Sequence, residues 1–115
     1  MGDGQVGKQV LGEFEQIVLL SVVRLGEHAY GRAVFEEIER LSVTPVTITA
    51  VYVTLSRLEK KNFVGVSKGT PPGSGREQKL FSVLPGGNEA LRRSREQLAR
   101  FWDGVEVSAG SDAGQ

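Results

Sequence analysis

The chain contains no cysteine and only one histidine, His28, among its 115 residues. Disulfide frameworks, thiolate nucleophiles, iron–sulfur clusters and cysteine-based zinc sites are therefore excluded. A serine–histidine–acid triad would have to use that single imidazole, and a histidine metal site normally needs more than one. We therefore expect a protein that is not an enzyme and that carries no metal or other cofactor.

Long hydrophobic runs are also missing. The longest apolar stretch, residues 17–23, is far shorter than the ~20 residues that span a bilayer. Glu13 and Glu15 precede this stretch, where a signal peptide would carry positive charge. We expect no membrane partner and a cytoplasmic location.

The chain has no excess of charge of either sign, because 14 basic and 14 acidic side chains cancel. The charges are nevertheless unevenly spread along the chain. Residues 1–56 carry four basic and seven acidic side chains, residues 57–100 carry ten and four, and residues 101–115 carry none and three. A basic block of this kind is typical of a surface that binds a polyanion.

Hydrophobic periodicity predicts three helices in the first half of the chain, after a flexible tail over residues 1–9. The first two cover residues 10–25 and 30–41, and Gly26 follows the first where a C-terminal cap belongs. The third runs from an N-cap at Thr47 to about Asn62. Its predicted buried stripe consists of Ile48, Tyr52, Leu55 and Leu58.

Two alternating segments, residues 63–68 and 78–84, predict a β-hairpin whose connection is rich in glycine and proline. A fourth helix is predicted over residues 86–103 and a second flexible tail over 106–115. Leu91, Leu98 and Val105 lie seven residues apart, as in a short dimerisation seam. The predicted fold class is therefore mainly α with a small hairpin. It is a winged helix-turn-helix over residues 10–84, followed by a C-terminal dimerisation helix over residues 85–105.

Two segments carry a resemblance to a known family: LGEFEQIVLLSVVRLGEHAYG at residues 11–31 and VYVTLSRLEKKNFV at residues 51–64. With Gly75, Arg76 and Phe81 in the hairpin, they resemble the PadR family of bacterial transcriptional regulators. The resemblance implies a repressor that binds a double-stranded DNA operator as a homodimer. It also places the chain with short members that have one helix after the wing and no separate effector domain.

On this interpretation the third helix enters the DNA major groove and the wing contacts the flanking backbone. The expected DNA-binding residues are Thr47, Thr49, Ala50, Val53, Thr54, Arg57, Lys68, Arg76 and Lys79. The expected dimer interface consists of Leu91, Leu98, Phe101, Trp102 and Val105. We expect the ring of Tyr52 to pack in the core, and Arg92, Arg93 and Arg95 to form a solvated face.

Two alternatives stay open at the level of sequence. A winged helix also serves as a protein-interaction module, and the zero net charge is compatible with that role. Family members often respond to small aromatic compounds, and Phe101 and Trp102 are the local candidates for binding an aromatic effector. The alternative to an aromatic effector is that the protein has no direct effector and is controlled by its own abundance.

Overall fold

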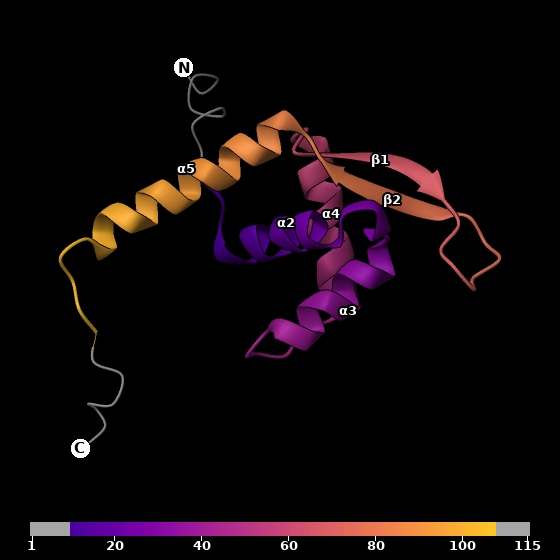
Figure 1. Ribbon diagram of the computed structural model, residues 1–115, viewed down its shortest axis with the longest axis horizontal. Helices are drawn as coiled ribbons and strands as arrows, with labels where there is room; N and C mark the ends of the chain where they lie inside the picture. The colour runs from indigo at the N-terminus through magenta and orange to yellow at the C-terminus, as the bar shows by residue number, and fades with distance from the viewer. Residues whose placement is uncertain (1–9, 108–115) are drawn as a thin grey trace.

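The computed structural model describes residues 10–107, which form three helices, a hairpin and a fourth helix in the predicted order (Figure 1). The elements are α2 (Glu13–Leu25), the short 3-10 helix η1 (Gly26–His28), α3 (Gly31–Leu41), α4 (Ile48–Lys60), β1 (Val64–Gly69), β2 (Gln78–Val83) and α5 (Pro85–Trp102). The predicted winged helix-turn-helix with an added C-terminal helix is therefore confirmed. Of the two expected tails, only residues 106–107 fall within the described part of the chain.

Local chemistry sets the helix boundaries. Gly26 follows α2 with φ +57°, a conformation that a side chain would disfavour. The hydroxyl of Thr47 caps α4 by accepting a hydrogen bond of 3.1 Å from the N–H of Ala50. Asn62 ends the same segment with φ +63°, as expected for a residue that tolerates the left-handed region. The predicted caps of the first and third helices are thus confirmed.

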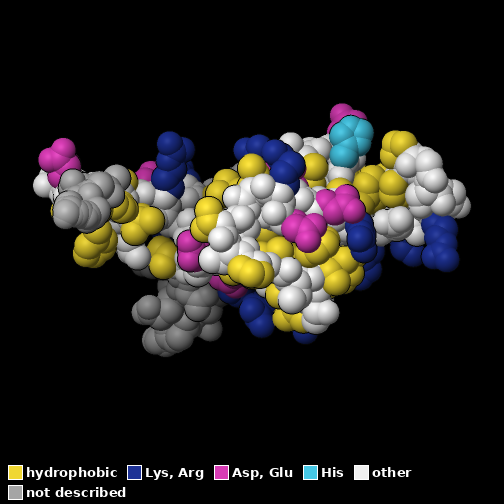
Figure 2. Space-filling view, turned by 90° about the horizontal axis from the view of Figure 1, so that it is seen from below, with side chains coloured by type: hydrophobic (Ala, Val, Ile, Leu, Met, Phe, Trp, Pro, Cys, Tyr) yellow, Lys and Arg dark blue, Asp and Glu magenta, His cyan; other side chains and the backbone are white. Residues whose placement is uncertain are grey.

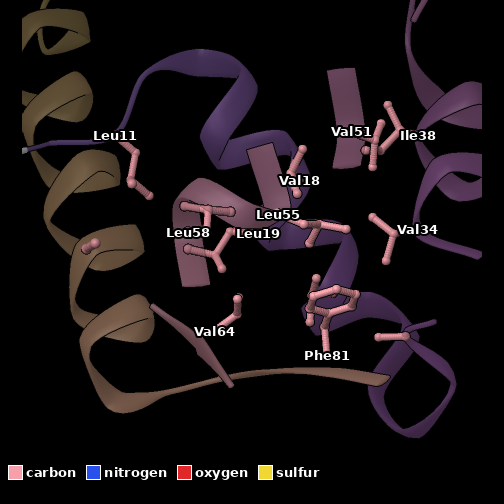
Figure 3. Packing of buried hydrophobic residues seen from close by; sticks show 13 residues of the cluster. Leu11, Val18, Leu19, Val34, Ile38, Val51, Leu55, Leu58, Val64 and Phe81 are labelled. Atoms are coloured by element: carbon pink, nitrogen blue, oxygen red, sulfur yellow. The ribbon is translucent and has the colours of Figure 1, made fainter. Parts of the chain in front are cut away.

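One hydrophobic core joins all three helices of the body to the hairpin (Figure 3). Each element contributes fully buried aliphatic side chains, which are Val18 and Leu19 from α2, Val34 and Ile38 from α3, Val51, Leu55 and Leu58 from α4, and Val64 from β1. Burying one such side chain stabilises the fold by ~1.5–3 kcal/mol. The core therefore fixes the orientation of α4 relative to the other elements.

The hairpin is held against the helical body by a third, very short strand segment that the sequence analysis did not predict. β1 and β2 pair antiparallel from Val64 opposite Val83 to Gly69 opposite Gln78. On the outer side of β2, Tyr30 forms an isolated bridge with Leu80, and the N–H of Phe81 donates to the carbonyl of Ala29 at 2.9 Å. This contact fixes the base of the wing, while the turn between the strands projects from the body (Figure 1).

Only the first half of α5 packs on the body of its own chain. Gly87 and Ala90 are buried, and a Cβ at Gly87 would overlap the carbonyl oxygen of Phe63, so this helix turn needs glycine. Ser94 is also buried, and its hydroxyl accepts a hydrogen bond of 2.8 Å from the N–H of Leu11. From Arg95 onwards every residue of α5 is exposed, and Figure 1 shows this half extending away from the other elements.

No helix within residues 10–107 is long and apolar enough to cross a membrane.

A partly buried ion pair ties the start of α2 to the end of α4. Lys61 Nζ lies 2.9 Å from Glu15 Oε2. Burial raises the pKa of the Glu15 carboxyl, but hydrogen bonds from Lys61 and from the N–H of Gly12 outweigh it, so the pKa lies below its ordinary value. The charges of Lys61 and Arg57 lower it further. Because the folded pKa is depressed, this carboxylate stabilises the fold above its unfolded pKa, and that contribution is lost as the pH falls.

We therefore predict that Lys61→Met lowers the free energy of unfolding by about 1 kcal/mol at neutral pH. The difference from the wild type should shrink as the pH falls below the ordinary value of 4.5 and through the depressed folded pKa. Urea unfolding at a series of pH values measures this. Lys60→Met is the control, since Lys60 is exposed and makes no salt bridge within residues 10–107. A loss for Lys61→Met that is independent of pH would contradict the assignment.

Candidate nucleic-acid interface

Helix α4 turns one face into the core and leaves the opposite face in solvent. Val51, Leu55 and Leu58 are at most 1% exposed. Residues placed about half a turn away from them, at 100° per residue, must point outward. The exposed residues are Thr49, Ala50, Tyr52, Val53, Ser56, Arg57, Glu59 and Lys60. The structure thus places four of the predicted helix contacts, Thr49, Ala50, Val53 and Arg57, on the outer face, and the capping residue Thr47 is exposed beside them.

Two expectations about α4 are wrong. Thr54 is only 4% exposed, because it lies three residues after Val51 and four before Leu58 and so shares their buried face. It cannot present its side chain to a ligand. Tyr52 does not pack in the core, since its side chain is 46% exposed. Its ring lies against the surface of Gly31, where an added Cβ would come within 2.7 Å of the ring carbon Cε1.

The wing places a pair of like charges face to face. Lys68 on β1 and Lys79 on β2 are directly opposite in the register, and both are exposed. Directly opposite side chains lie on the same face of the hairpin, where like charges repel. Arg76 is exposed in the turn that connects the strands, as the sequence analysis expected for a wing residue.

A groove of about 500 Å³ connects the wing to α4. Its walls are formed by Tyr52, Ser56 and Glu59 of α4, by Gln78, Lys79 and Phe81 of β2, and by Gly31 and Leu55. A second, shallower hollow continues along α4 and is lined by Tyr52, Val53, Ser56, Arg57 and Lys60. Lys79 and the outer face of α4 therefore border one continuous surface. Together with Lys68, which lies opposite Lys79, and Arg76 in the adjoining turn, we call it the α4–wing surface. Figure 2 shows Lys and Arg side chains along the lower edge of the molecule, from the helical body to the hairpin.

Salt-bridge pairing divides the basic side chains into two groups. Away from the α4–wing surface, Arg24 and Arg40 pair with Glu37, Arg32 with Glu36, Lys61 with Glu15, Arg92 with Glu89 and Glu96, and Arg93 with Glu89. Among residues 10–107, no salt bridge involves the five cations of the α4–wing surface, which are Arg57, Lys60, Lys68, Arg76 and Lys79. Arg95 and Arg100 on the exposed half of α5 also make none. Glu59 is the acidic residue that lines the groove.

The paired arginines of α5 lie on its charged flank. Hydrogen bonds to Glu89 and Glu96 raise the pKa of the Arg92 guanidinium above its ordinary value. On α3, hydrogen bonds from Arg24 and Arg40 lower the pKa of the Glu37 carboxyl below its ordinary value. The charge of each of these arginines is therefore balanced, in part or in full, by a neighbouring carboxylate on the surface.

The predicted dimer residues separate into two sets. Leu91 is half-buried against the core of its own chain. Leu98, Phe101, Trp102 and Val105 are all more than half exposed, and Phe101 reaches 74%. Val105 lies beyond the end of α5, and Ser94, which falls within the predicted seam, is buried inside the monomer. Of the predicted dimer residues, those that are exposed therefore lie at the projecting end of α5 and just beyond it, where Figure 2 shows hydrophobic side chains exposed.

Three residues of the α4–wing surface are not among the expected DNA-binding residues. Tyr52 was expected in the core, Ser56 was expected on the outer face but not as a DNA contact, and Lys60 was not considered. Their positions follow from the phase of the helix once Val51 is known to be buried. His28 lies exposed in η1. Within residues 10–107, His, Asp and Glu side chains form no cluster of three that could hold a metal ion.

Comparisons with known proteins agree with this fold. The model of the transcriptional regulator PadR-like family matches residues 19–93, which is more than half of the chain. No curated protein sequence matches the chain.

Three solved structures resemble it in fold. A Streptococcus transcriptional regulator is 20% identical with a TM-score of 0.68, and the match covers 80% of this chain and 87% of that one. A PadR family regulator from Clostridium difficile R20291 is 24% identical with a TM-score of 0.60, over 77% and 92% of the two chains. The Aeropyrum pernix ORC1 protein in complex with DNA is 21% identical with a TM-score of 0.61, over 79% of this chain but 26% of its own.

The like-charge pair of the wing leads to a stability prediction. Lys79→Gln should raise the free energy of unfolding by roughly 0.2–1 kcal/mol at low salt, because it removes the repulsion of Lys68 across the hairpin. The gain should shrink as added salt screens the pair. Chemical denaturation at several salt concentrations measures the effect. Lys60→Gln is the matched control. It removes an exposed lysine of α4, which has no partner across the hairpin, and should therefore change stability less.

Proposed function

Because the chain belongs to the PadR-like family of transcriptional regulators, whose members are not enzymes, we propose that it binds a double-stranded DNA operator through the α4–wing surface. The observation that carries this proposal is the segregation of unpaired cations in a protein with no net charge. Five basic side chains that make no salt bridge within residues 10–107 lie on the α4–wing surface, and two of them oppose each other on the wing. Such an arrangement costs folding free energy that a polyanion repays on binding.

The shape of the surface favours duplex DNA among polyanions. The outer face of α4 carries small side chains, Thr49, Ala50, Val53 and Ser56, which let a helix lie deep in the major groove. Arg57 and Lys60 follow this strip in the last turn of α4, a place suited to contact with the phosphates at the groove edge. The wing then brings Lys68, Arg76 and Lys79 to the adjacent backbone. The helix supplies sequence preference, and the wing supplies position and affinity.

A binding selection from random duplex DNA tests this function. We predict that the wild-type protein enriches one sequence and that log Kd changes linearly with log salt, with a slope of about 0.9 for each phosphate contacted. Lys79→Gln should weaken binding to all sequences alike and lower that slope by about one unit. Since the same substitution is predicted to stabilise the fold, weaker binding cannot be ascribed to unfolding. Selection that enriches no sequence, with no shift in gel mobility at low salt, would contradict the function.

We also propose that the protein acts as a homodimer joined through the projecting end of α5. Its exposed half leaves Leu98, Phe101 and Trp102 more than half exposed. A second copy related by a two-fold axis covers this surface with the same surface of its own. The 18 residues of α5 span about 27 Å at ~1.5 Å per residue, so the helix reaches well beyond the body. A two-fold pair of this kind places the two α4 helices about 34 Å apart, which is one turn of DNA.

Leu98→Asp should therefore convert the dimer to monomers and strongly weaken operator binding, because it buries a charge in an apolar contact. Sedimentation equilibrium and gel shifts measure the two effects. Gln97→Asp is the matched control, since it adds the same charge to the neighbouring exposed position of α5 and should keep the dimer. A wild type that is monomeric at micromolar concentration and still binds its operator with full affinity would contradict the dimer.

The regulatory consequence is repression. A dimer that covers two successive major grooves excludes polymerase when its operator overlaps a promoter. Reconstituted transcription from a promoter that contains the selected sequence should fall as the protein is added and recover for Leu98→Asp.

A small aromatic effector is the corresponding proposal for control. Phe101 and Trp102 form the exposed aromatic pair at the dimer end of α5. A ligand bound there changes the spacing of the two α4 helices only if its affinities for the DNA-binding and the non-binding arrangement of the dimer differ. The alternative is regulation by abundance alone. Fluorescence of Trp102, the one tryptophan of the chain, during titration with planar aromatic compounds distinguishes the two.

The second candidate function is a protein-interaction module. It is favoured by an apolar groove of about 560 Å³ beside the turn between α3 and α4, whose lining includes Phe14, Ile17, Leu41 and Val43. Val43 there is 99% exposed. The selection experiment separates the two functions, because a module of this kind enriches no DNA sequence.

A further inference from the structure

An exposed valine occupies the middle of the outward face of α4. The side chain of Val53 is 49% exposed and lies in the hollow lined by Tyr52, Ser56, Arg57 and Lys60. Thr49, also exposed, lies four residues earlier, so its side chain is next to Val53 on the same face of the helix. This face therefore carries a small, partly apolar strip that is followed by two cations toward the C-terminal end of α4.

A single exposed valine is ordinary on a protein surface. Here Arg57 and Lys60, which make no salt bridge within residues 10–107, follow it about one and two turns further along α4, on the face proposed to enter a major groove. A ligand that fits presents an apolar group to Val53 and anionic groups to the two cations beyond it. The major groove does so where thymine C5-methyl groups lie on its floor between the two phosphate backbones.

The composition of α4 also limits how this helix distinguishes base pairs. Residues 48–60 contain no Asn or Gln, the side chains that bind adenine through two hydrogen bonds. Arg57 lies on the flank of the strip, toward Glu15, whose pKa its charge helps to lower. Apart from single hydrogen bonds of the Thr49 and Ser56 hydroxyls, the contact that this face offers to an A·T pair is apolar contact with the thymine C5-methyl group.

We infer that Val53, together with the methyl group of Thr49, recognises the C5-methyl group of a thymine at the centre of each operator half-site. The inference rests on the proposed function, because it assigns a base contact to the same surface. It makes Val53 a specificity-determining residue, and it predicts that the selected sequence has thymine at matching positions in both half-sites. Contact with one methyl group should contribute roughly a fourfold change in affinity in each half-site, as expected for burial of one CH₂-sized group.

Deoxyuridine substitution tests this contact, because uracil differs from thymine at this position only by the missing C5-methyl group. Each thymine of the selected duplex is replaced in turn, and Kd is measured for the wild-type protein. One thymine in each half-site should show a loss of roughly fourfold. This scan needs no protein variant, so it does not depend on whether a variant folds.

Val53→Ala then identifies the residue that makes the contact. The substitution removes two methyl groups at an exposed helix position, where alanine is a better helix former. It should weaken binding to the thymine duplex and abolish most of the difference between the thymine and deoxyuridine duplexes. Val23→Ala is the matched control, since Val23 on α2 is also 49% exposed but lies away from α4 and should keep the full difference.

The outcomes separate this inference from the function on which it rests. If selection enriches no sequence, the DNA-binding function fails and the inference fails with it. If a sequence is enriched but no thymine shows a methyl dependence, the function stands and the inference is overturned. It is also overturned if Val53→Ala and the wild type lose affinity by the same factor when thymine is replaced by deoxyuridine, because the methyl group is then recognised by another residue.

Discussion

The burial of one face of α4 is the constraint on which the rest of the structure depends. Val51, Leu55 and Leu58 are enclosed by α2, α3 and the start of the hairpin, and any rotation of the helix would expose one of them (Figure 3). Exposure of one large aliphatic side chain costs ~1.5–3 kcal/mol, which is a large fraction of the stability of a small domain. The helix is therefore held in one orientation, and the residues of its outer face need no stabilising role within the fold.

The charges follow from the same constraint. Basic residues that lie next to acidic ones on α2, α3 and α5 form salt bridges within the chain, as Arg24 and Arg92 do. The outer face of α4 and the wing carry cations with Glu59 and Glu77 as their acidic neighbours, and the strand register sets Lys68 against Lys79. A chain with no net charge thus carries an excess of basic side chains on the α4–wing surface. The overall charge balance hides this surface because the compensating carboxylates lie on other elements.

Much of the fold was predictable from local signals in the sequence. Gly26, Thr47 and Asn62 mark helix ends because their backbone preferences act within a few residues. The phase of α4 was harder to predict. The stripes that begin at Tyr52 and at Val51 both continue to Leu55 and Leu58 at helical spacing, and only packing against α2 and α3 decides between them.

That ambiguity explains why Thr54 was assigned to the surface and Tyr52 to the core. The bridge from Tyr30 to Leu80 and the hydrogen bond from Leu11 to Ser94 join residues 50 and 83 positions apart. Local sequence patterns carry no information about such contacts. The candidate site was therefore predictable in its elements and in most of its residues, and the exceptions are the residues that tertiary packing places.

In the proposed complex, the outer faces of the two α4 helices of a dimer lie in two successive major grooves of one duplex. Because the chain has no cysteine, Ser56→Cys introduces a single thiol on that face, to which an iron–EDTA group can be attached. On the selected duplex, we expect two clusters of strand cleavage, one in each half-site, about one helical turn apart. Glu27→Cys, on the exposed η1 segment, should give no such pair. Cleavage from Ser56→Cys that is absent, or that is spread evenly along the duplex, would contradict this mode of binding.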